Sequence, residues 1–234
     1  MKRTYDWLPA EVSTAGRENL DADHVARYDV IEDATAAEEV ALLAGLGLDA
    51  QSLIVDIGAG TGQFAVAAAP TCGRVVAVDV SPVMLDALRA KVDAAGLANV
   101  DVEQAGFLSY NHRGRPADFV YSRYALHHLP DFWKAVAFDR IRCMLRPGGV
   151  LRLSDVVYHF EPGEAEHRLE TWCASLAPTA RDGWSRADIV EHVRDEHSTF
   201  TWLLEPMLEL SGFTIEDAVY SPDGIFASYL ARAP

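Results

Sequence analysis

The chain is poor in cysteine and lacks any long apolar run. Its cysteines, Cys72, Cys143 and Cys173, are widely spaced and form no Cys-x-x-Cys pair. This pattern indicates neither a disulfide framework nor a structural zinc site, and we expect no bound metal. No stretch approaches the ~18 apolar residues of a membrane span, and the first residues lack an apolar signal core. These absences favour a cytoplasmic protein that keeps its thiols reduced.

Positive charge is also scarce. The 234 residues include 20 lysines and arginines against 35 aspartates and glutamates, for a formal net charge of −15 at pH 7. Nucleic-acid binding needs a basic surface that displaces counterions, so we expect no nucleic-acid partner. The lack of a span argues against a membrane partner, and a homodimer is left open. A hydrophobic content of 50% suffices for one α/β domain with a full core.

From Ser52 onward, short apolar runs alternate with helical patterns, which predicts an α/β fold with a doubly wound, mostly parallel sheet. The seven expected strands lie at 53–57, 75–80, 100–104, 117–122, 150–157, 213–220 and 225–231. The last two flank Ser-Pro-Asp-Gly at 221–224, which predicts an antiparallel hairpin. Residues 1–48 are expected to form an N-terminal helical cover over the main domain, 49–234. A helical insertion is expected at about 161–205, before the sixth strand.

The most informative segment is Val-Asp-Ile-Gly-Ala-Gly-Thr-Gly at 55–62. It lies between a β-branched apolar run and an alanine-rich run, which predicts a strand, a tight turn and a helix. Glycines at such a turn let the backbone reverse, and they let a ligand approach the main chain without interference from Cβ atoms. Asp79 ends the next apolar strand, where its carboxylate can accept hydrogen bonds from both hydroxyls of a ribose. The pattern therefore favours a nucleoside-containing cofactor.

The glycine spacing separates two classes of cofactor. A dinucleotide fingerprint has glycines at its first, third and sixth positions, with a pyrophosphate on the helix N-terminus. Here the third glycine, Gly62, stands at the fifth position and Gln63 at the sixth, which disfavours a hydride-transferring dehydrogenase. This Asp-x-Gly-x-Gly-x-Gly form resembles motif I of class I S-adenosylmethionine-dependent methyltransferases.

The resemblance extends over most of the chain. Tyr-Ser-Arg-Tyr-Ala-Leu-His-His-Leu at 121–129 is similar to the segment after strand four in the small-molecule branch of the family. Leu-Arg-Pro-Gly-Gly-Val-Leu at 145–151 is similar to the family's turn into strand five, which predicts a turn at 146–149. His-Val-Ala-Arg-Tyr-Asp at 24–29 resembles an N-terminal motif of ubiquinone and menaquinone methyltransferases. The closing hairpin is similar to the family's antiparallel last strand.

This resemblance implies a Rossmann-like, seven-stranded methyltransferase fold with S-adenosyl-L-methionine as the cofactor. The implied reaction transfers a methyl group to an O, N or C nucleophile of a small-molecule acceptor. An RNA or protein methyltransferase is an alternative, although the acidic balance speaks against RNA. A cofactor-binding protein without catalysis is the other alternative, and it would need no acceptor cavity beside the methyl group.

The resemblance also implies the residues of the cofactor site. Gly58 and Gly60 would lie against the cofactor, where a side chain would occupy its space. Asp79 would hold the ribose, and Asp56 would organise the glycine turn or accept from the methionine ammonium group. Tyr28 would lie near the methionine carboxylate. The other expected contacts are Ala59, Gly62, Val80, Met84, Gly106, Phe107 and Arg123.

One position departs from the family pattern. The family usually has an acidic residue after strand three that hydrogen-bonds the adenine amine, whereas Gly106 stands at about that place here. We therefore expect a backbone carbonyl to meet the amine, and Phe107 or Leu108 to pack on the adenine ring.

Two histidines are the candidates for a catalytic base. His127 and His128 follow the fourth strand, at the edge where α/β sheets bind their ligands. The leaving group of a sulfonium methyl transfer is a neutral thioether and needs no acid. A base is therefore required only if the acceptor is protonated at the working pH.

Overall fold

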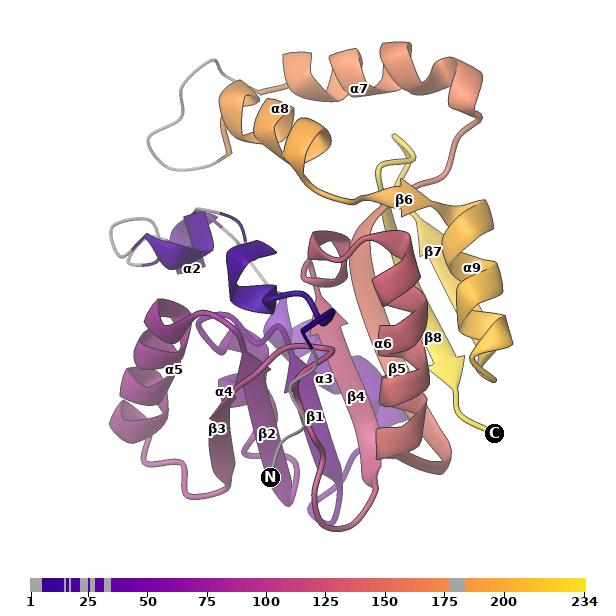
Figure 1. Cartoon of the computed structure of the whole chain (residues 1–234). Coiled ribbons are helices and arrows are strands. Elements are labelled where there is room, and N and C mark those ends of the chain that lie inside the picture. Colours follow the sequence, from indigo (N-terminus) through magenta and orange to yellow (C-terminus); the bar gives the residue numbers. More distant parts are fainter. Residues whose placement is uncertain are drawn as a thin grey trace.

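An eight-stranded sheet forms the centre of the protein, seen here in a computed structural model that describes residues 6–14, 16, 18–21, 25, 28–31, 35–176 and 184–234 (Figure 1). The strands are β1 (Leu53–Ile57), β2 (Arg74–Asp79), β3 (Val100–Gln104), β4 (Ala117–Arg123), β5 (Leu145–Tyr158), β6 (Thr199–Phe200), β7 (Thr214–Tyr220) and β8 (Phe226–Arg232). Their order is β3-β2-β1-β4-β5-β8-β7, and β6 pairs with β5. Only β8 pairs antiparallel with its neighbours, β5 and β7. The α/β, Rossmann-like, mostly parallel sheet with an antiparallel last strand is thus confirmed.

The described helices cover both faces of this sheet. They are α2 (Tyr28–Ile31), α3 (Ala36–Gly45), α4 (Gln63–Ala68), α5 (Pro82–Ala94), α6 (Asp131–Met144), α7 (Ala165–Ala174), α8 (Arg186–Asp195) and α9 (Thr201–Leu210), with short 3-10 turns η1 (Glu11–Thr14), η2 (Glu18–Leu20), η3 (Leu126–His128) and η4 (Pro162–Glu164). Side chains alternate between the faces of a strand, so β1 sends Ile54 toward α3, α4 and α5 and Ile57 toward the opposite face. Every residue of β1 is buried as a result, which explains its unbroken apolar run.

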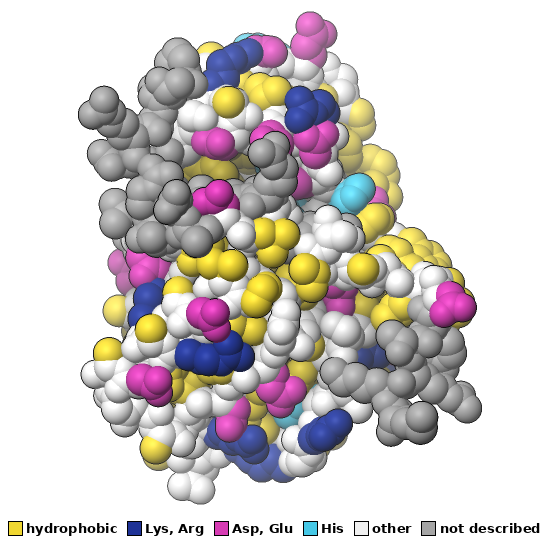
Figure 2. All heavy atoms as spheres, turned by 60° about the vertical axis from the view of Figure 1, so that its left-hand side comes forward, with side chains coloured by type: hydrophobic (Ala, Val, Ile, Leu, Met, Phe, Trp, Pro, Cys, Tyr) yellow, Lys and Arg dark blue, Asp and Glu magenta, His cyan; other side chains and the backbone are white. Residues whose placement is uncertain are grey.

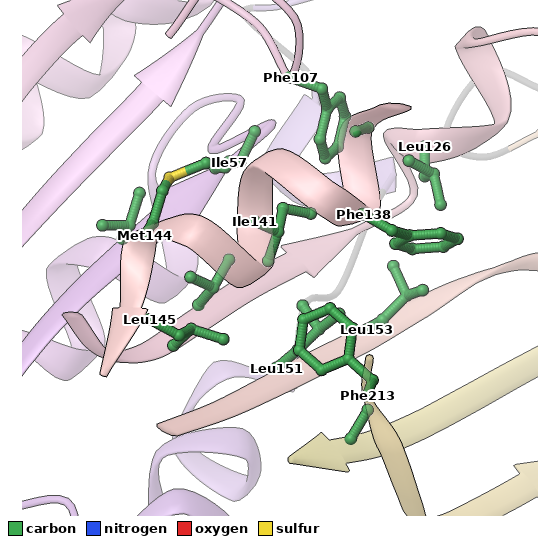
Figure 3. Close-up of a cluster of buried hydrophobic side chains, with 14 of the residues drawn as sticks. Ile57, Phe107, Leu126, Phe138, Ile141, Met144, Leu145, Leu151, Leu153 and Phe213 are labelled. Atoms are coloured by element: carbon green, nitrogen blue, oxygen red, sulfur yellow. The ribbon is translucent and has the colours of Figure 1, made fainter. Parts of the chain in front are cut away.

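The core on the second face centres on α6 (Figure 3). Phe138 and Ile141 of this helix are almost completely buried, and they belong to the same cluster as Leu151 and Leu153 of β5. Helix α9 adds Leu204 and Leu208 to that cluster, so it shares the core of the main sheet. The last part of the stretch expected as an insertion therefore packs as an ordinary layer helix.

Two expectations about strands were wrong. Residues 146–149 form no separate turn, because β5 begins at Leu145 and passes through them. The pairing with β4 shifts from Ala117↔Leu145 to Phe119↔Val150, so a bulge absorbs the Pro-Gly-Gly residues inside the strand. Gly148 has a φ of +71°, which suits such an irregularity. The sheet also has an eighth strand, the two-residue β6, within the stretch predicted to be a helical insertion.

Two additions cover the carboxyl edge of the sheet. In Figure 1 the N-terminal segment with α2 lies above the ends of β1 and β2, and α7 and α8 lie above β4 and β5. A capping box begins α8, because Ser185 Oγ accepts from the backbone N–H of Asp188 and the Asp188 carboxylate accepts from the backbone N–H of Ser185. The division into a cover at 1–48 and a main domain stays a prediction. No helix within the described ranges is long and apolar enough to cross a membrane.

Candidate active site

A cavity lies at the carboxyl ends of β1, β2, β3 and β4, beneath the N-terminal segment. It has about 620 Å³ of empty space, counted out to its open mouth. The predicted residues that line it are Tyr28, Gly58, Gly60, Asp79, Val80, Met84, Gly106, Phe107, Arg123 and His128. A neighbouring hollow shares part of this lining and adds the predicted Asp56 and Ala59. Residues from five separate parts of the chain thus meet at one edge, as expected for ligand sites of open α/β sheets.

Asp79 closes the glycine turn from the end of β2. Its Oδ2 accepts from the backbone N–H of Gly60 and its Oδ1 from that of Ser81, both at 2.8 Å. Burial raises the pKa of Asp79, and these backbone hydrogen bonds partly oppose the rise. The carboxylate is therefore held in a fixed orientation at the cavity wall, where it can accept further hydrogen bonds from a ligand.

Asp56 carries the clearest unsatisfied group of the site. The residue is 2% exposed, and its Oδ2 has no hydrogen-bond partner among the described residues. Burial, together with the nearby charge of Asp79, raises the pKa of Asp56 well above its ordinary value. A buried carboxylate oxygen without a partner is costly. A cationic donor in the adjoining hollow would satisfy it, which fits the ammonium group of the expected cofactor.

The three motif glycines serve different purposes. A Cβ at Gly58 would lie 2.2 Å from the Ala125 Cβ, so the close approach of the segment after β4 requires glycine there. At Gly60 a Cβ would meet only ordinary contacts, but the φ of +53° favours glycine. Gly62 lines neither hollow, and a Cβ there would lie 2.6 Å from Leu88 Cγ. Gly62 therefore packs the turn against α5.

Replacing Gly62 with alanine is expected to lower the free energy of unfolding by about 1–3 kcal/mol, because its φ of +81° is unfavourable for alanine and the added methyl group overpacks the fully buried Leu88. Affinity for S-adenosylhomocysteine in the folded protein is expected to change little. Urea unfolding and calorimetric titration measure the two quantities. Gly96→Ala is the control, because Gly96 has a similar positive φ of +63° and a Cβ there would meet nothing within 4 Å. Unchanged stability with lost affinity would contradict the packing role.

Two polar residues of the lining were missed in the sequence. Glu11 and Asn19 come from the N-terminal segment, which gave no motif there, and only the fold brings them to the cavity. Tyr124 lines both hollows and adopts a φ of +50°, which is uncommon for a residue other than glycine. That positive φ is a signal of a functional site, but a sequence does not reveal it. The Arg123 guanidinium lies 4.4 Å from the centre of the Tyr124 ring. Apart from histidine, Arg123 is the one basic side chain among the described residues that line the cavity.

A buried cluster of ionisable side chains lies behind the wall that His128 provides. His127 Nδ1 and Asp155 Oδ1 are 2.5 Å apart, and His127 Nε2 lies 3.2 Å from Glu196 Oε2. The same Glu196 oxygen contacts His192 Nδ1 of α8. His127, His192 and Glu196 each offer a ligand atom within 4.8 Å of the others, so these three residues could hold a metal ion. One Glu196 carboxylate oxygen contacts both imidazoles. The cluster therefore ties α8 to the end of β4.

The pKa values of the two neighbouring histidines in this cluster shift in opposite directions. Burial alone would lower the pKa of His127, but the charges of Asp155 and Glu196 outweigh it and raise the pKa. Burial, then the positive charge of His127, lower the pKa of His128 to about 3. A histidine with a raised pKa, His127, thus stands behind a His128 that is neutral at neutral pH. Only His128 lines the cavity, so the two base candidates are not equivalent.

The fold and the cavity together define a Rossmann-like protein with a ligand site at the carboxyl ends of its strands. Residues 54–149 match a family model described as a methyltransferase domain. An "uncharacterized methyltransferase" of Anoxybacillus flavithermus is 26% identical over 164 residues, which are 70% of each chain. The trans-aconitate 2-methyltransferase of Methylobacterium radiotolerans is 31% identical over 157 residues, which are 66% of this chain and 56% of that protein.

A solved structure extends the likeness to nearly the whole chain. The N-methyltransferase NodS of Bradyrhizobium japonicum, in complex with S-adenosylhomocysteine, superimposes with a TM-score of 0.64 at 19% identity. The match covers 97% of this chain and 100% of that one, and at this identity it shows the fold. Residues 54–149 thus carry a methyltransferase domain similar to those of class I S-adenosylmethionine-dependent methyltransferases, and S-adenosylmethionine is its cofactor.

Proposed function

We propose that the protein transfers the sulfonium methyl group of S-adenosylmethionine to an oxygen, nitrogen or carbon atom of a small organic acceptor. The observation that supports this proposal is Asp56 Oδ2, which has no hydrogen-bond partner among the described residues. Asp56 lines a hollow next to the cavity, and Asp79 at the end of β2 lines the cavity itself. Asp56 would accept from the ammonium group, Asp79 from the ribose hydroxyls, and Tyr28 and Arg123 would meet the carboxylate. The remaining predicted contacts, Ala59, Val80, Met84, Gly106 and Phe107, would line the nucleoside or the glycine turn.

The chain's own task in the reaction is alignment. The bound cofactor supplies an electrophilic methyl group with a neutral thioether as leaving group. The side chains that form the cavity orient the acceptor in line with that methyl group, and the N-terminal segment and α7–α8 exclude water. Effective molarity gains of this kind supply about 7–11 kcal/mol in well-aligned systems.

His128 contacts the acceptor in this proposal, and His127 acts through it. A neutral imidazole can accept a hydrogen bond from an acceptor hydroxyl or amine. Because its pKa is lowered to about 3, His128 is a weak base near neutral pH, and it orients the acceptor more than it removes a proton. The His127–Asp155 pair fixes the backbone turn that carries it.

A small acceptor is favoured over RNA or protein. On the described part of the face in Figure 2, lysine and arginine side chains are interspersed with aspartate and glutamate and form no broad basic stripe. The Methylobacterium relative is named a trans-aconitate 2-methyltransferase, which supports a small acceptor. All three cysteines are free, which fits work in the reducing cytoplasm.

Assignment to the ubiquinone and menaquinone branch remains a proposal. It rests on the motif at 24–29, of which His24, Ala26 and Arg27 lie outside the described residues.

Methyl uptake from isotope-labelled S-adenosylmethionine tests the function. We expect label in the small-molecule fraction of a cell extract, and none in its RNA or protein fractions. Binding of S-adenosylhomocysteine, measured by calorimetry in parallel, separates the alternatives. Label in RNA or protein would contradict the small acceptor, and tight binding without transfer to any fraction would indicate a non-catalytic cofactor-binding protein.

A further inference from the structure

Glu11 brings a carboxylate from the N-terminal segment into the cofactor cavity. The residue is only 8% exposed and lies in η1, yet it lines the same cavity as Asp79. Its Oε1 accepts from the backbone N–H of Leu108 at 2.9 Å, and its Oε2 accepts from Ser109 Oγ at 2.6 Å. Both partners belong to the loop after β3, almost a hundred residues further along the chain. The cover and the cavity wall are thus joined through this one carboxylate.

Gly106 provides the space that Glu11 fills. A Cβ at Gly106 would lie 2.4 Å from Glu11 Oε1 and 2.6 Å from its Cδ. The φ of Gly106 lies outside the left-handed region, so its backbone conformation does not require glycine. The requirement comes from the approach of the carboxylate and of Val80 Cγ1, which would lie 2.7 Å from that Cβ. The loop after β3 therefore lacks an acidic side chain of its own at this point and receives one from the cover.

The position of Glu11 along the sheet edge indicates which part of a nucleoside it faces. Asp79 ends β2, and the next strand along the edge, β3, leads into the loop that holds Glu11. Ala105 at the start of that loop donates from its backbone N–H to the Asp79 carbonyl at 3.0 Å, so the two wall segments are adjacent. With the ribose held at Asp79, the base extends toward the loop after β3. The carboxylate that a base would meet there is Glu11.

We propose that Glu11 selects the adenine base of the cofactor by accepting a hydrogen bond from its exocyclic amine. This inference rests on the cofactor role proposed for Asp79. A carboxylate has about four acceptor positions, so Glu11 can hold the loop after β3 and also accept from a ligand. A base with a carbonyl oxygen in place of the amine would set two acceptors against each other. The sequence-based expectation of a backbone carbonyl as the partner of the amine is thereby replaced.

A consequence is that the N-terminal segment is part of the cofactor pocket. Among the described residues that line the cavity, Glu11 is the one from this segment with a carboxylate. It is also held at Ser81, whose Oγ donates to the Asn19 carbonyl, and at Thr61, whose Oγ1 donates to Asp29 Oδ1, both at 2.5 Å. Contacts that form between Glu11 and a bound cofactor stabilise the docked segment by the same amount that the docked segment stabilises the cofactor.

The test compares two ligands that differ only at the base. The dissociation constants of S-adenosylhomocysteine and S-inosylhomocysteine are measured by calorimetry for the full-length chain and for Glu11→Gln. Hydrogen bonds to charged groups contribute about 1.5–3 kcal/mol, so we expect the unmodified protein to prefer adenosine by roughly tenfold to a hundredfold. Glutamine can donate to the inosine carbonyl, so the preference should collapse toward unity. Glu38→Gln, an exposed glutamate on α3, is the control and should keep the full preference.

A second variant disturbs the contact between Glu11 and Gly106 by changing Gly106. Gly106→Ala places a methyl group where Glu11 Oε1 lies, and it should also reduce the preference for adenosine. Equal weakening of both ligands in Glu11→Gln, with the ratio unchanged, would overturn the base-selecting role and leave the cofactor assignment intact. Failure of the unmodified protein to bind S-adenosylhomocysteine would instead overturn the proposed function, and this inference with it.

Discussion

Asp56→Asn is expected to weaken binding of S-adenosylmethionine by roughly thirtyfold to several thousandfold. Removing one partner of a desolvated charge pair costs about 2–5 kcal/mol, and the ammonium group of the cofactor would lose its carboxylate. Calorimetric titration at neutral pH measures the change. Asp86→Asn is the matched control, because that side chain is 77% exposed on α5 and forms only a surface pair with Arg89.

The same substitution is expected to stabilise the protein without ligand. Burial raises the pKa of Asp56 above that of the unfolded chain, so ionisation of Asp56 opposes folding. The contribution of the acid group to stability is therefore highest below its ordinary pKa of 3.8 and falls as the pH rises through the raised pKa. The Tm of Asp56→Asn should exceed that of the unmodified protein at neutral pH, and the difference should shrink on acidification. A variant that is less stable at neutral pH and binds normally would contradict both expectations.

Asp79→Ala should lower the affinity for S-adenosylmethionine by roughly tenfold to a hundredfold or more. Both ribose hydroxyls would lose a charged acceptor, and each such bond contributes about 1.5–3 kcal/mol. The substitution also removes the partner of the Gly60 and Ser81 backbone N–H groups, so the glycine turn loses its anchor to β2. The fold should survive, because Asp79 stands at a strand end that faces the cavity.

Two further variants allow the cofactor affinities to be ranked. Asp79→Asn keeps one acceptor oxygen and loses the charge, so its affinity should fall less than that of Asp79→Ala. His128→Ala changes another wall of the same cavity and should leave cofactor affinity nearly unchanged, whatever happens to turnover. Titration of the cofactor into all three proteins decides the order. An Asp79→Ala protein that binds as tightly as the unmodified chain would refute the ribose role.

Local chemistry made much of the site predictable from the sequence. A strand, a glycine turn and a helix follow one another within residues 53–68, so their hydrogen bonds and dihedral angles depend on nearby residues. The start of α5 is local for the same reason, because Ser81 Oγ accepts from the Met84 backbone N–H as a cap and Pro82 opens the helix. The placement of Asp79 beside the glycine turn followed from the parallel alternation of strands.

Other features depended on contacts between distant segments. Pro-Gly-Gly is a turn by composition, but Leu145 before it pairs with β4 and Val150 after it pairs with both β4 and β8, so β5 includes the three residues as a bulge. The different purposes of the motif glycines were also hidden, because Ala125 and Leu88 approach Gly58 and Gly62 only in the folded chain. His127 and His128 are adjacent in sequence, yet Asp155 and Glu196 raise the pKa of His127, whereas burial and the charge of His127 lower the pKa of His128.

The sequence by itself determined the parallel sheet, the nucleoside-binding turn and the carboxylate at the end of β2, because strand periodicity and turn chemistry are local properties. Tertiary structure alone decided that Glu11 reaches Gly106 across almost a hundred residues, and that a charged cluster supports His128. The physical reason is that burial and the approach of distant groups set the space, the acceptors and the pKa values of a site, and neither is encoded within a short window of sequence.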